Sequence, residues 1–378
     1  MIVVFNAVAW GFEHVPFDAA FLATTAEAYP GEPIHFFAEK DHLGQTQRFL
    51  DSRRALPGVE WRELVLPPRL APPRARWRDD LRVCRQVLSE AQRLGAERVI
   101  ACYLHAITGT LALKALRLLH RKSSLALIHH SGVMKLASSR RLHPLLELGN
   151  RRLRQLVLGD AIRAEVIGQF PGMAGTLHAI RHPYFFEEAS PSELPLPADG
   201  PITFSFVGLI DETKGFPGFV ELAGALAPAW DGAVRFDLIG GKREGVTPAM
   251  TGPHVTAYAH DGPLAREVFE QKLGETAYTV FPYDPEYYRL VASGSVLDAL
   301  AAGKPIIALR NPQFDEMFQV MGDIGYLCDD VAGIKRTIEA ILREPPRARY
   351  AQQSRNTLSA RRLFEPAQVA TQLRAALA

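Results

Sequence analysis

The chain has 378 residues, more than one ordinary hydrophobic core accommodates, which predicts two domains. Hydrophobic residues make up 47% and charged residues 22%, which excludes a disordered or fibrous protein. The net charge of +2 is unevenly divided: residues 1–186 hold 25 Lys and Arg against 16 Asp and Glu, and the remainder hold 18 against 25. Either the basic half meets an anionic partner, or its arginines are simply solvated.

Three cysteines, Cys84, Cys102 and Cys328, are far apart and lack metal-ligand spacing. We therefore expect a reducing compartment, without disulfides or structural zinc. The first residues, MIVVFNAVAW, lack a signal-peptide pattern and are typical of a buried strand. No apolar stretch is long enough to span a bilayer. These features predict a cytoplasmic protein.

Short apolar runs alternate with helical patterns in the first half, as in a parallel sheet wrapped by helices. The predicted strands are residues 2–7, 34–38, 99–103, 125–129 and 177–180, and the predicted helices include 18–28, 80–94 and 109–120. Acidic residues and prolines then replace this periodicity over residues 187–200, which indicates a linker. Residues 1–186 are therefore predicted to form one Rossmann-like, doubly wound domain.

The alternation restarts at residue 201 and predicts a second α/β domain over residues 201–359. Its predicted strands are 202–208, 234–241, 278–283 and 304–309, and its predicted helices include 217–227, 264–273 and 295–302. A C-terminal helix, about residues 360–378, is expected to pack back on the first domain. Ligands bind outside the carboxyl ends of such strands, so two such domains in series predict a cleft between their facing edges.

Two segments of the second domain are suited to binding an anion. Gly208 ends a predicted strand and Lys214 follows in the next loop, where backbone N–H groups and a lysine would approach a diphosphate, unless the lysine is merely solvated. Residues 293–295, Ser-Gly-Ser, precede a helix and form a second cradle. Asp298, one turn later, would accept hydrogen bonds from a ribose diol or only complement the helix dipole.

Together these segments resemble the donor domain of the GT-B glycosyltransferases, in particular the glycogen-synthase-related (group 1) nucleotide-sugar family. The matching text is Gly208-Leu209-Ile210, Lys214-Gly215, Gly240-Gly241 and residues 298–306, DALAAGKPI. The resemblance implies a GT-B fold, two Rossmann-like domains facing each other across a cleft, and a UDP- or GDP-sugar donor. It also implies that Lys214 neutralises the leaving diphosphate, that residues 293–295 hold its oxygens and that Asp298 binds the ribose. The donor-binding residues are predicted to be Gly208, Lys214, Gly240, Gly241, Tyr283, Glu286, Ser293, Gly294, Ser295 and Asp298.

The sequence differs from this family at three positions. Leu209 replaces a diphosphate-binding arginine, and Asp298 is shorter than the usual glutamate. Leu290 replaces a carboxylate that touches the sugar, and Glu286, four residues earlier, is a candidate substitute. The sugar and the choice between retention and inversion stay open. No Asp-x-Asp motif occurs, so we expect no metal and no cofactor besides the nucleotide-sugar substrate.

Polar residues in the loop after the first strand are acceptor-side candidates. Glu13 and His14 would orient or deprotonate an acceptor hydroxyl, or would only form hydrogen bonds within the loop. Asp18 is expected to be the N-cap or a first-turn acid of the following helix.

Histidines end two further strands. Related enzymes carry a histidine close to the transferred sugar after the strand matching residues 125–129, so the resemblance favours His130 as a polar contact. His129 is expected to point into the sheet packing, and His105 is explained equally well as structural. The predicted catalytic residues are Glu13, His14 and His130.

A basic segment interleaved with leucines follows these histidines. Its charged residues are Lys135, Arg140, Arg141, Arg151, Arg152 and Arg154. It predicts a surface for anionic lipid or a lipid-diphosphate acceptor, or else an ordinary helix with solvated arginines. No aromatics are interleaved with the basic residues, so nucleic acid is not an expected partner.

The sequence therefore predicts a metal-independent, hexosyltransferase-type glycosyltransferase at the inner face of the cell membrane. It would act in polysaccharide biosynthesis, on a glycan or lipid-linked acceptor. Two alternatives stay open: a nucleotide-sugar epimerase or hydrolase on the same scaffold, and a non-catalytic sugar-binding subunit.

Overall fold

The computed structural model describes residues 1–67, 73–117, 122–137, 141, 143–144, 153–186, 194–210, 212–241, 251–258 and 264–378. The chain forms two compact units. Unit 1 comprises Met1–Phe185, Leu290–Ala292 and Leu363–Ala378, and unit 2 comprises Phe186–Arg289 and Ser293–Arg362. The predicted linker begins unit 2, and its residues 187–193 lie outside the described part of the chain.

Unit 1 is built on a seven-stranded parallel sheet of order β3-β2-β1-β4-β5-β6-β7. Its strands are β1 (Ile2–Asn6), β2 (Ile34–Ala38), β3 (Val59–Glu63), β4 (Arg98–Tyr103), β5 (Ser124–His129), β6 (Leu153–Val157) and β7 (Leu177–Ala179). Its helices include α1 (Val15–Ala28), α2 (Lys40–Arg53), α3 (Pro73–Arg93), α4 (Thr108–Leu116), α5 (Gly132–Ala137), α7 (Asp160–Gln169) and α15 (Pro366–Leu377). The strand order reverses between β1 and β4, where open α/β sheets bind ligands.

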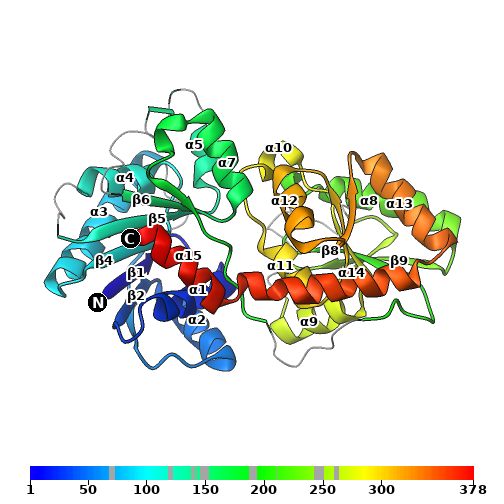
Figure 1. The fold of residues 1–378 in the computed structure, drawn as a ribbon, viewed down its shortest axis with the longest axis horizontal. Coiled ribbons are helices and arrows are strands. Elements are labelled where there is room, and N and C mark those ends of the chain that lie inside the picture. The colour runs from blue at the N-terminus through cyan, green and yellow to red at the C-terminus, as the bar shows by residue number, and fades with distance from the viewer. Residues whose placement is uncertain are drawn as a thin grey trace. The chain divides into compact units, whose positions relative to one another are not determined.

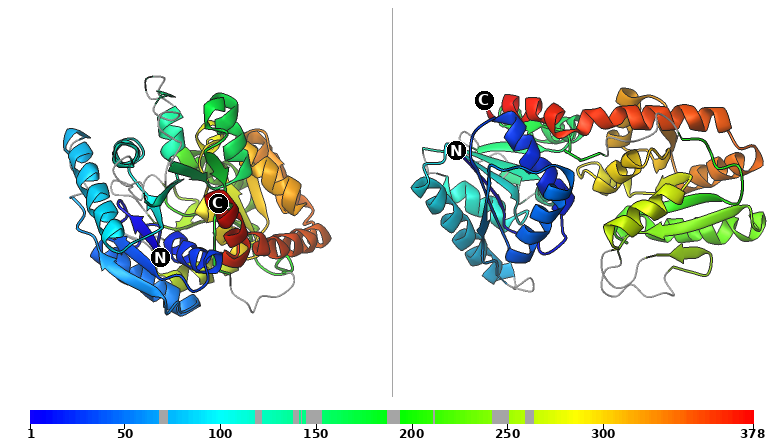
Figure 2. Two further views of the ribbon diagram at one scale, coloured as in Figure 1. Left: turned by 60° about the vertical axis from the view of Figure 1, so that its left-hand side comes forward. Right: turned by 90° about the horizontal axis from the view of Figure 1, so that it is seen from below.

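Both faces of the unit 1 sheet are covered by helices (Figures 1 and 2). The side chains of β1 show why its sequence is apolar throughout: Ile2 and Val4 pack into one core cluster, and Val3 and Phe5 into another. Alternate residues of a strand point to opposite faces, so a central parallel strand is buried on both.

The C-terminal helix α15 closes one face of unit 1. It lies beside α1 (Figure 1), and its Val369 and Leu373 share a core cluster with Phe17 and Phe21. The side chain of Gln372 accepts a hydrogen bond from the N–H of Arg181 (2.7 Å). The last residues of the chain thus complete the hydrophobic core formed by the first.

Unit 2 is built on a six-stranded parallel sheet of order β10-β9-β8-β11-β12-β13. Its strands are β8 (Ile202–Val207), β9 (Val234–Ile239), β10 (Val255–Ala257), β11 (Tyr278–Phe281), β12 (Ile306–Leu309) and β13 (Gly325–Cys328). Its helices include α8 (Phe216–Leu226), α9 (Arg266–Glu275), α10 (Pro285–Tyr288), α11 (Gly294–Ala301), α12 (Pro312–Met321), α13 (Val331–Arg343) and α14 (Arg347–Ala360). The strand order reverses between β8 and β11.

Aromatic side chains fill the centre of unit 2. The ring of Phe204 on β8 stacks on Phe236 (centroids 5.9 Å apart) and on Tyr278 (5.6 Å). All three side chains are fully buried, so they contribute much of the apolar area that stabilises this unit.

Four strands were not predicted from the sequence. They are β3, β6, β10 and β13. The strand β6 corrects the helical interpretation of the basic segment, because Arg154 lies within this strand and not on a helix. Charged and polar residues in β3 and β6 hide the apolar run by which a buried strand is identified.

No helix among those described combines the length and hydrophobicity needed to cross a bilayer.

Candidate functional site

Three of the residues predicted to bind the donor meet where the strand order of unit 2 reverses. Gly208 follows β8, Lys214 ends the short 3₁₀ turn Glu212–Lys214, and Ser295 lies in the first turn of α11. The Lys214 Nζ donates a hydrogen bond to Ser295 Oγ (3.0 Å), although 81 residues separate them. Lys214, the glycine turn and the start of α11 therefore converge in space.

Two glycines keep the backbone of this cluster close-packed. Gly208 has φ of +102°, and a Cβ there would lie 2.2 Å from Ser295 Oγ and 2.8 Å from Lys214 Nζ. A Cβ on Gly240, at the end of β9, would lie 1.9 Å from the carbonyl oxygen of Gly208. Larger residues at either position would displace the turn, and the missing side chains let an anion approach the backbone.

Tyr283 lines the same cluster from the end of β11. Its side chain is buried, its hydroxyl is 2.9 Å from Ser293 Oγ, and its ring centroid is 6.0 Å from Lys214 Nζ. Burial raises the pKa of this phenol, so it stays neutral and serves as a hydrogen-bonding group.

The start of α11 offers backbone N–H groups to a ligand. Ser293 occupies the N-cap position, but its side chain does not cap the helix. Gly294 is the first helical residue, without a side chain to shield the N–H groups of this turn. Helix N-termini of this kind attract phosphate through their N–H groups and the positive end of the dipole.

The carboxylate of Asp298 is held by a residue that the sequence analysis missed. Arg266, the first residue of α9, donates from Nη1 to Asp298 Oδ1 (3.1 Å) and from Nε to Glu270 Oε1 (2.7 Å). The Asp298 side chain retains 17% exposure. Arg266 and Asp298 are 32 residues apart, so no local pattern signals the pair.

The remaining donor-side candidates lie in different environments. Gly241 accepts a hydrogen bond from the N–H of Ile210 (3.0 Å), which ties the turns after β8 and β9 together. The Glu286 side chain is 84% exposed, and its Oε2 lies 3.7 Å from Nη2 of Arg289, three residues further along the chain. Leu290 is buried in a core cluster of unit 1 with Val133.

In unit 1, histidines and aromatic rings gather at the carboxyl ends of β1, β4 and β5. The ring of His130 lies 4.8 Å from His14, 5.0 Å from Tyr103 and 4.5 Å from Phe17. His182 packs against the same Phe17 (4.9 Å). Desolvation lowers the pKa of His130 well below its usual value, and the neighbouring imidazoles act in the same direction. At neutral pH His130 is therefore an uncharged polar group.

The other acceptor-side candidates have the following contacts. Glu13 is exposed and accepts a hydrogen bond from the N–H of Trp10 (3.2 Å) within its own loop. His14 is the N-cap residue of α1, without a side-chain cap. Asp18 lies in the first turn of α1 but is fully buried, with Oδ2 2.7 Å from His42 Nε2.

The histidines at the ends of β4 and β5 have buried partners. His129 is buried, and its Nε2 lies 2.9 Å from Gln155 Oε1 on β6. His105 Nδ1 lies 2.8 Å from Asp80 Oδ1, and Thr108 donates to the other oxygen of this buried carboxylate. Both histidines have structural partners within unit 1.

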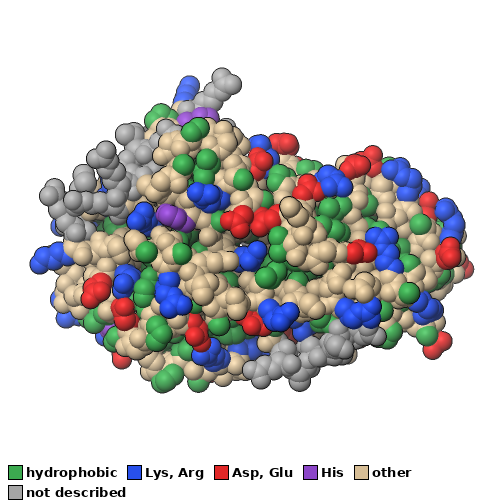
Figure 3. Space-filling view, viewed as in Figure 1, with side chains coloured by type: hydrophobic (Ala, Val, Ile, Leu, Met, Phe, Trp, Pro, Cys, Tyr) green, Lys and Arg blue, Asp and Glu red, His purple; other side chains and the backbone are tan. Residues whose placement is uncertain are grey.

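Only part of the predicted basic surface can be located. Lys135 and Arg141 are exposed, and Arg154 projects from β6 to donate to the carbonyl of Ala378 (3.3 Å). Arg140, Arg151 and Arg152 lie outside the described residues. On the face shown in Figure 3, lysines and arginines are scattered among other side chains, not joined in one patch.

A different basic feature occurs on α3. A hollow of about 450 Å³ lies along the exposed side of this helix. The residues lining it are Arg78, Leu81, Arg82, Arg85, Gln86 and Ser89. The sequence analysis did not identify this surface, because its arginines are one helical turn apart and mixed with buried positions.

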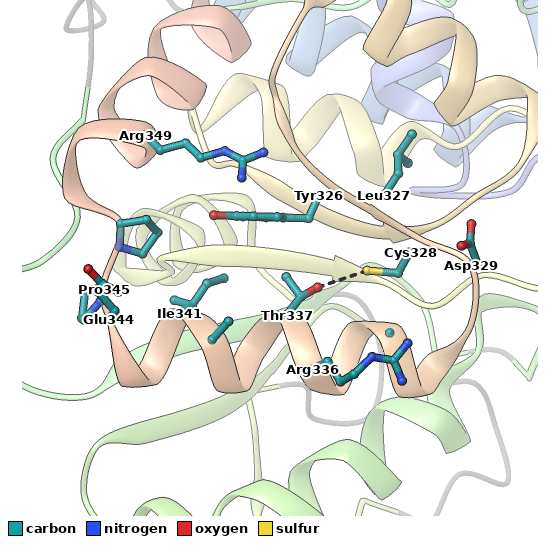
Figure 4. A pocket seen from close by; sticks show the side chains of 13 residues that line it. Tyr326, Leu327, Cys328, Asp329, Arg336, Thr337, Ile341, Glu344, Pro345 and Arg349 are labelled. Carbon is teal, nitrogen blue, oxygen red and sulfur yellow. Dashed lines mark hydrogen bonds between the residues drawn. The ribbon is translucent and has the colours of Figure 1, made fainter.

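A second hollow, of about 630 Å³, lies between β13 and α13 (Figure 4). Tyr326 and Cys328 form one wall and Thr337 and Ile341 the other, and Cys328 Sγ lies 3.5 Å from Thr337 Oγ1. None of the residues singled out by the sequence analysis as site residues lines it.

Within the described part of the chain, no group of three or more His, Cys, Asp and Glu side chains is arranged to hold a metal ion.

The architecture is shared with several solved structures. A sucrose-phosphate synthase from Thermosynechococcus elongatus superposes with a TM-score of 0.69 at 16% identity, over 99% of this chain and 97% of that one. HepE from Anabaena, solved with UDP-glucose, gives 0.68 at 14% identity over 99% and 98%. An α,α-trehalose-phosphate synthase from Burkholderia xenovorans, solved with glucose-6-phosphate, gives 0.65 at 11% identity over 100% of both chains. The chain has the GT-B fold.

This result confirms the predicted fold class and the resemblance from which it was expected. No model of a known protein family matches the sequence. No curated protein matches it either. Because the sequence identities to the solved structures are low, the structural similarity establishes the fold alone. The chemistry has to be argued from the residues of this chain.

Proposed function

We propose that this protein is a glycosyltransferase that takes a sugar from a nucleotide-diphosphate donor. The observation that supports this best is the convergence of Gly208, Lys214 and Ser295 where the strand order of the second sheet reverses. A lysine, a glycine turn and a helix N-terminus together form a site for a diphosphate. HepE, with the same fold, binds UDP-glucose, which supports a UDP-sugar as the first donor to test.

In the proposed reaction, the residues of unit 2 stabilise charge on the leaving group. When the glycosidic bond to phosphate breaks, negative charge grows on the diphosphate oxygens. Lys214 and the N-terminus of α11 would bind that charge, and Asp298, oriented by Arg266, would accept hydrogen bonds from the ribose. This arrangement supports transfer without a metal, and chelation of divalent cations is expected to leave the rate unchanged.

For the acceptor, we propose a glycan or lipid-linked sugar bound at the ends of β1, β4 and β5. His130 and His14 supply uncharged polar contacts beside the ring of Tyr103. We further propose a role in cell-surface polysaccharide synthesis at the cytoplasmic face of the membrane, supported by the excess of basic residues in residues 1–186. Co-sedimentation with anionic vesicles, compared with neutral ones, tests this last part.

Nucleotide binding is the first test of the donor site. Lys214→Ala is expected to weaken UDP binding about tenfold to a hundredfold, since a charge-assisted contact to phosphate contributes about 1.5–3 kcal/mol. Calorimetry with UDP, GDP and dTDP measures it. Lys335→Ala, on α13 of the same unit, is the matched control and should bind normally. Equal affinities of the two variants would remove Lys214 from the site.

The reaction type is tested by product analysis. With donor and acceptor present, we expect a glycosylated acceptor and free nucleotide diphosphate, and Asp298→Asn should lower this turnover. Sugar left on its nucleotide with altered stereochemistry would identify an epimerase, and free sugar a hydrolase. If no nucleotide binds at all, the chain would be a sugar-binding subunit on a transferase fold.

A further inference from the structure

The loop between β1 and α1, residues 7–14, has an unusual backbone conformation. His14 has φ of 57°, the left-handed region, and among the non-glycine residues that the structure describes no other has a positive φ. A side chain at such an angle is strained, so the surrounding structure must hold it there. This loop carries both Glu13 and His14.

The first part of the loop is tied down by Asn6, the last residue of β1. Its side-chain oxygen accepts hydrogen bonds from the N–H groups of Val8 (3.1 Å) and Ala9 (2.9 Å). Its amide nitrogen donates to Asp18 Oδ2 (2.6 Å). Asp18 therefore connects the strand end to the first turn of α1.

The middle of the loop is held by His42, which projects from α2. Its side chain is fully buried, with Nδ1 2.8 Å from the carbonyl oxygen of Gly11 and Nε2 2.7 Å from Asp18 Oδ2. A carbonyl oxygen only accepts, and Asp18 Oδ2 already accepts from Asn6. Donation from both ring nitrogens, which is the protonated imidazolium, satisfies both partners in this arrangement.

The charges around His42 agree with this assignment. Burial by itself lowers the pKa of His42, but the hydrogen bond and charge of Asp18 outweigh it, so the pKa is raised above its usual value. The other titratable groups facing His42 are Glu39, at the N-terminus of α2, and His14, in the loop. Glu39 favours the charged ring, and its side chain accepts a hydrogen bond from the N–H of His42 (2.9 Å).

We infer that His42 is a positioning residue for the acceptor side of the site. Its imidazolium is paired with Asp18 and donates a hydrogen bond to the carbonyl of Gly11. These contacts keep the loop in the conformation in which the His14 ring packs against Tyr103 and His130. That His42 holds the loop follows from these contacts, whereas the effect of His42 on catalysis rests on the proposed function.

This arrangement makes the order of the loop depend on pH in one direction. The pKa of His42 in the folded protein lies above that of a free histidine. The stabilisation is therefore complete below the ordinary pKa and is lost as the pH rises through the raised one. Deprotonation leaves one hydrogen for two acceptors, so either Gly11 or Asp18 is released.

The first experiment does not depend on enzymatic activity. Nitrogen NMR of ¹⁵N-histidine-labelled protein is expected to show that both His42 ring nitrogens stay protonated to a higher pH than those of an ordinary histidine. In Asp18→Asn the ring should become neutral, and the signals of His14 should move. A His42 ring that is already neutral at pH 6.5 in the wild-type protein would overturn the inference.

The second experiment measures how the conformation of the loop affects the kinetic constants for acceptor and donor. His42→Gln is uncharged and carries both of its N–H groups on one nitrogen, so it does not reproduce the contacts that the two ring nitrogens make with Gly11 and Asp18. We therefore expect kcat/KM for the acceptor to fall about tenfold to a hundredfold, with donor KM unchanged. His35→Gln, a buried histidine on β2 of the same unit, is the matched control and should have wild-type kinetics. Wild-type acceptor kinetics in a folded His42→Gln protein would contradict the inference, as would equal losses for donor and acceptor.

Two outcomes separate this inference from the proposed function. If His42→Gln does not fold, Asp18→Asn serves in both experiments. Wild-type activity is expected to fall at alkaline pH as His42 loses its proton, and the activity of Asp18→Asn should lack this fall. If the wild-type protein transfers no sugar, the proposed function fails, and the NMR experiment still decides whether His42 holds the loop.

Discussion

Arg266 determines how the carboxylate of Asp298 is presented to a ligand. The two side chains form an ion pair, and Arg266 is itself held by Glu270 and lies over the ring of Phe269 (5.2 Å). If Asp298 binds the ribose as proposed, a carboxylate fixed in this way loses little rotational freedom, which lowers the entropic cost of binding. Asp298 is shorter than the family's glutamate, and the arginine supplies the orientation that a longer side chain would otherwise need.

His129 gives the first prediction at this scale. Desolvation lowers its pKa from 6.5 to about 4. Between these values the unfolded chain binds a proton that the folded protein does not, so the free energy of unfolding should fall as the pH falls. The contribution is about 3 kcal/mol. Urea denaturation from pH 6.5 to 4 measures it, and His129→Asn should flatten the dependence. Parallel profiles for the two proteins would show that His129 is not responsible.

Some residues of the candidate site were visible in the sequence and others were not. Gly208, Lys214 and Ser295 stood out because each lies next to a predicted strand end or helix start. Arg266 and His42 did not, because their partners are distant in the sequence and neither residue marks an element boundary by a recognisable pattern. A residue whose role depends on tertiary contacts leaves no local signal.

At the scale of elements, the turns after β8 and β9 depend on each other. The N–H of Gly208 donates a hydrogen bond to the carbonyl of Ile239 (2.8 Å), and the N–H of Ile210 donates to the carbonyl of Gly241 (3.0 Å). The two turns thus form one rigid unit under the start of α11. Rigid support of this kind would keep the proposed diphosphate site preorganised.

Gly208→Ala tests this coupling. The new Cβ would meet Ser295 Oγ and Lys214 Nζ well inside van der Waals distance, and the positive φ adds about 1–2 kcal/mol of strain. We expect at least a tenfold loss of nucleotide affinity, measured by calorimetry. Gly224→Ala, within α8, has no atom near its Cβ and should bind normally while gaining up to about 1 kcal/mol of stability. Normal binding by Gly208→Ala would show that the turn tolerates displacement.

Most of the strands that could be predicted are buried on both faces, although the edge strand β7, only partly buried, was predicted as well. β1, β5 and β8 are nearly continuous apolar runs, and such runs indicate central parallel strands. The strand β3 lies at the sheet edge and is only partly buried, so its sequence, VEWRE, carries no such run. The strand β6 contains Arg154 and the buried Gln155, and its polar character led to a helical interpretation of the basic segment.

At the scale of the whole molecule, unit 1 is assembled from three separate stretches of sequence. Residues 290–292 belong to it although they lie within the sequence of unit 2. Leu290 is buried with Val133, Val157 and Met173 in a core cluster of unit 1. The position that holds a carboxylate in the resembling family thus has a packing role here. No pattern along the sequence predicts such a short return of the chain.

Leu290→Ala is expected to destabilise unit 1 by about 2–5 kcal/mol, because it leaves a cavity in a buried cluster. Differential scanning calorimetry measures the loss. Val320→Ala, on α12, changes a residue that is 47% exposed and should alter stability by about 0.5 kcal/mol or less. Equal effects of the two substitutions would mean that Leu290 is not a core residue.

The interlaced path of the chain also limits how the protein can be divided. A fragment ending at Phe185 would lack α15, and the apolar surface of α1 around Phe17 and Phe21 would then face water. Such a fragment should aggregate or bind chaperones, since a large uncovered apolar area favours association. Unit 1 therefore cannot reach its stable state until α15 has left the ribosome, so its core closes only after the whole of unit 2 has been synthesised.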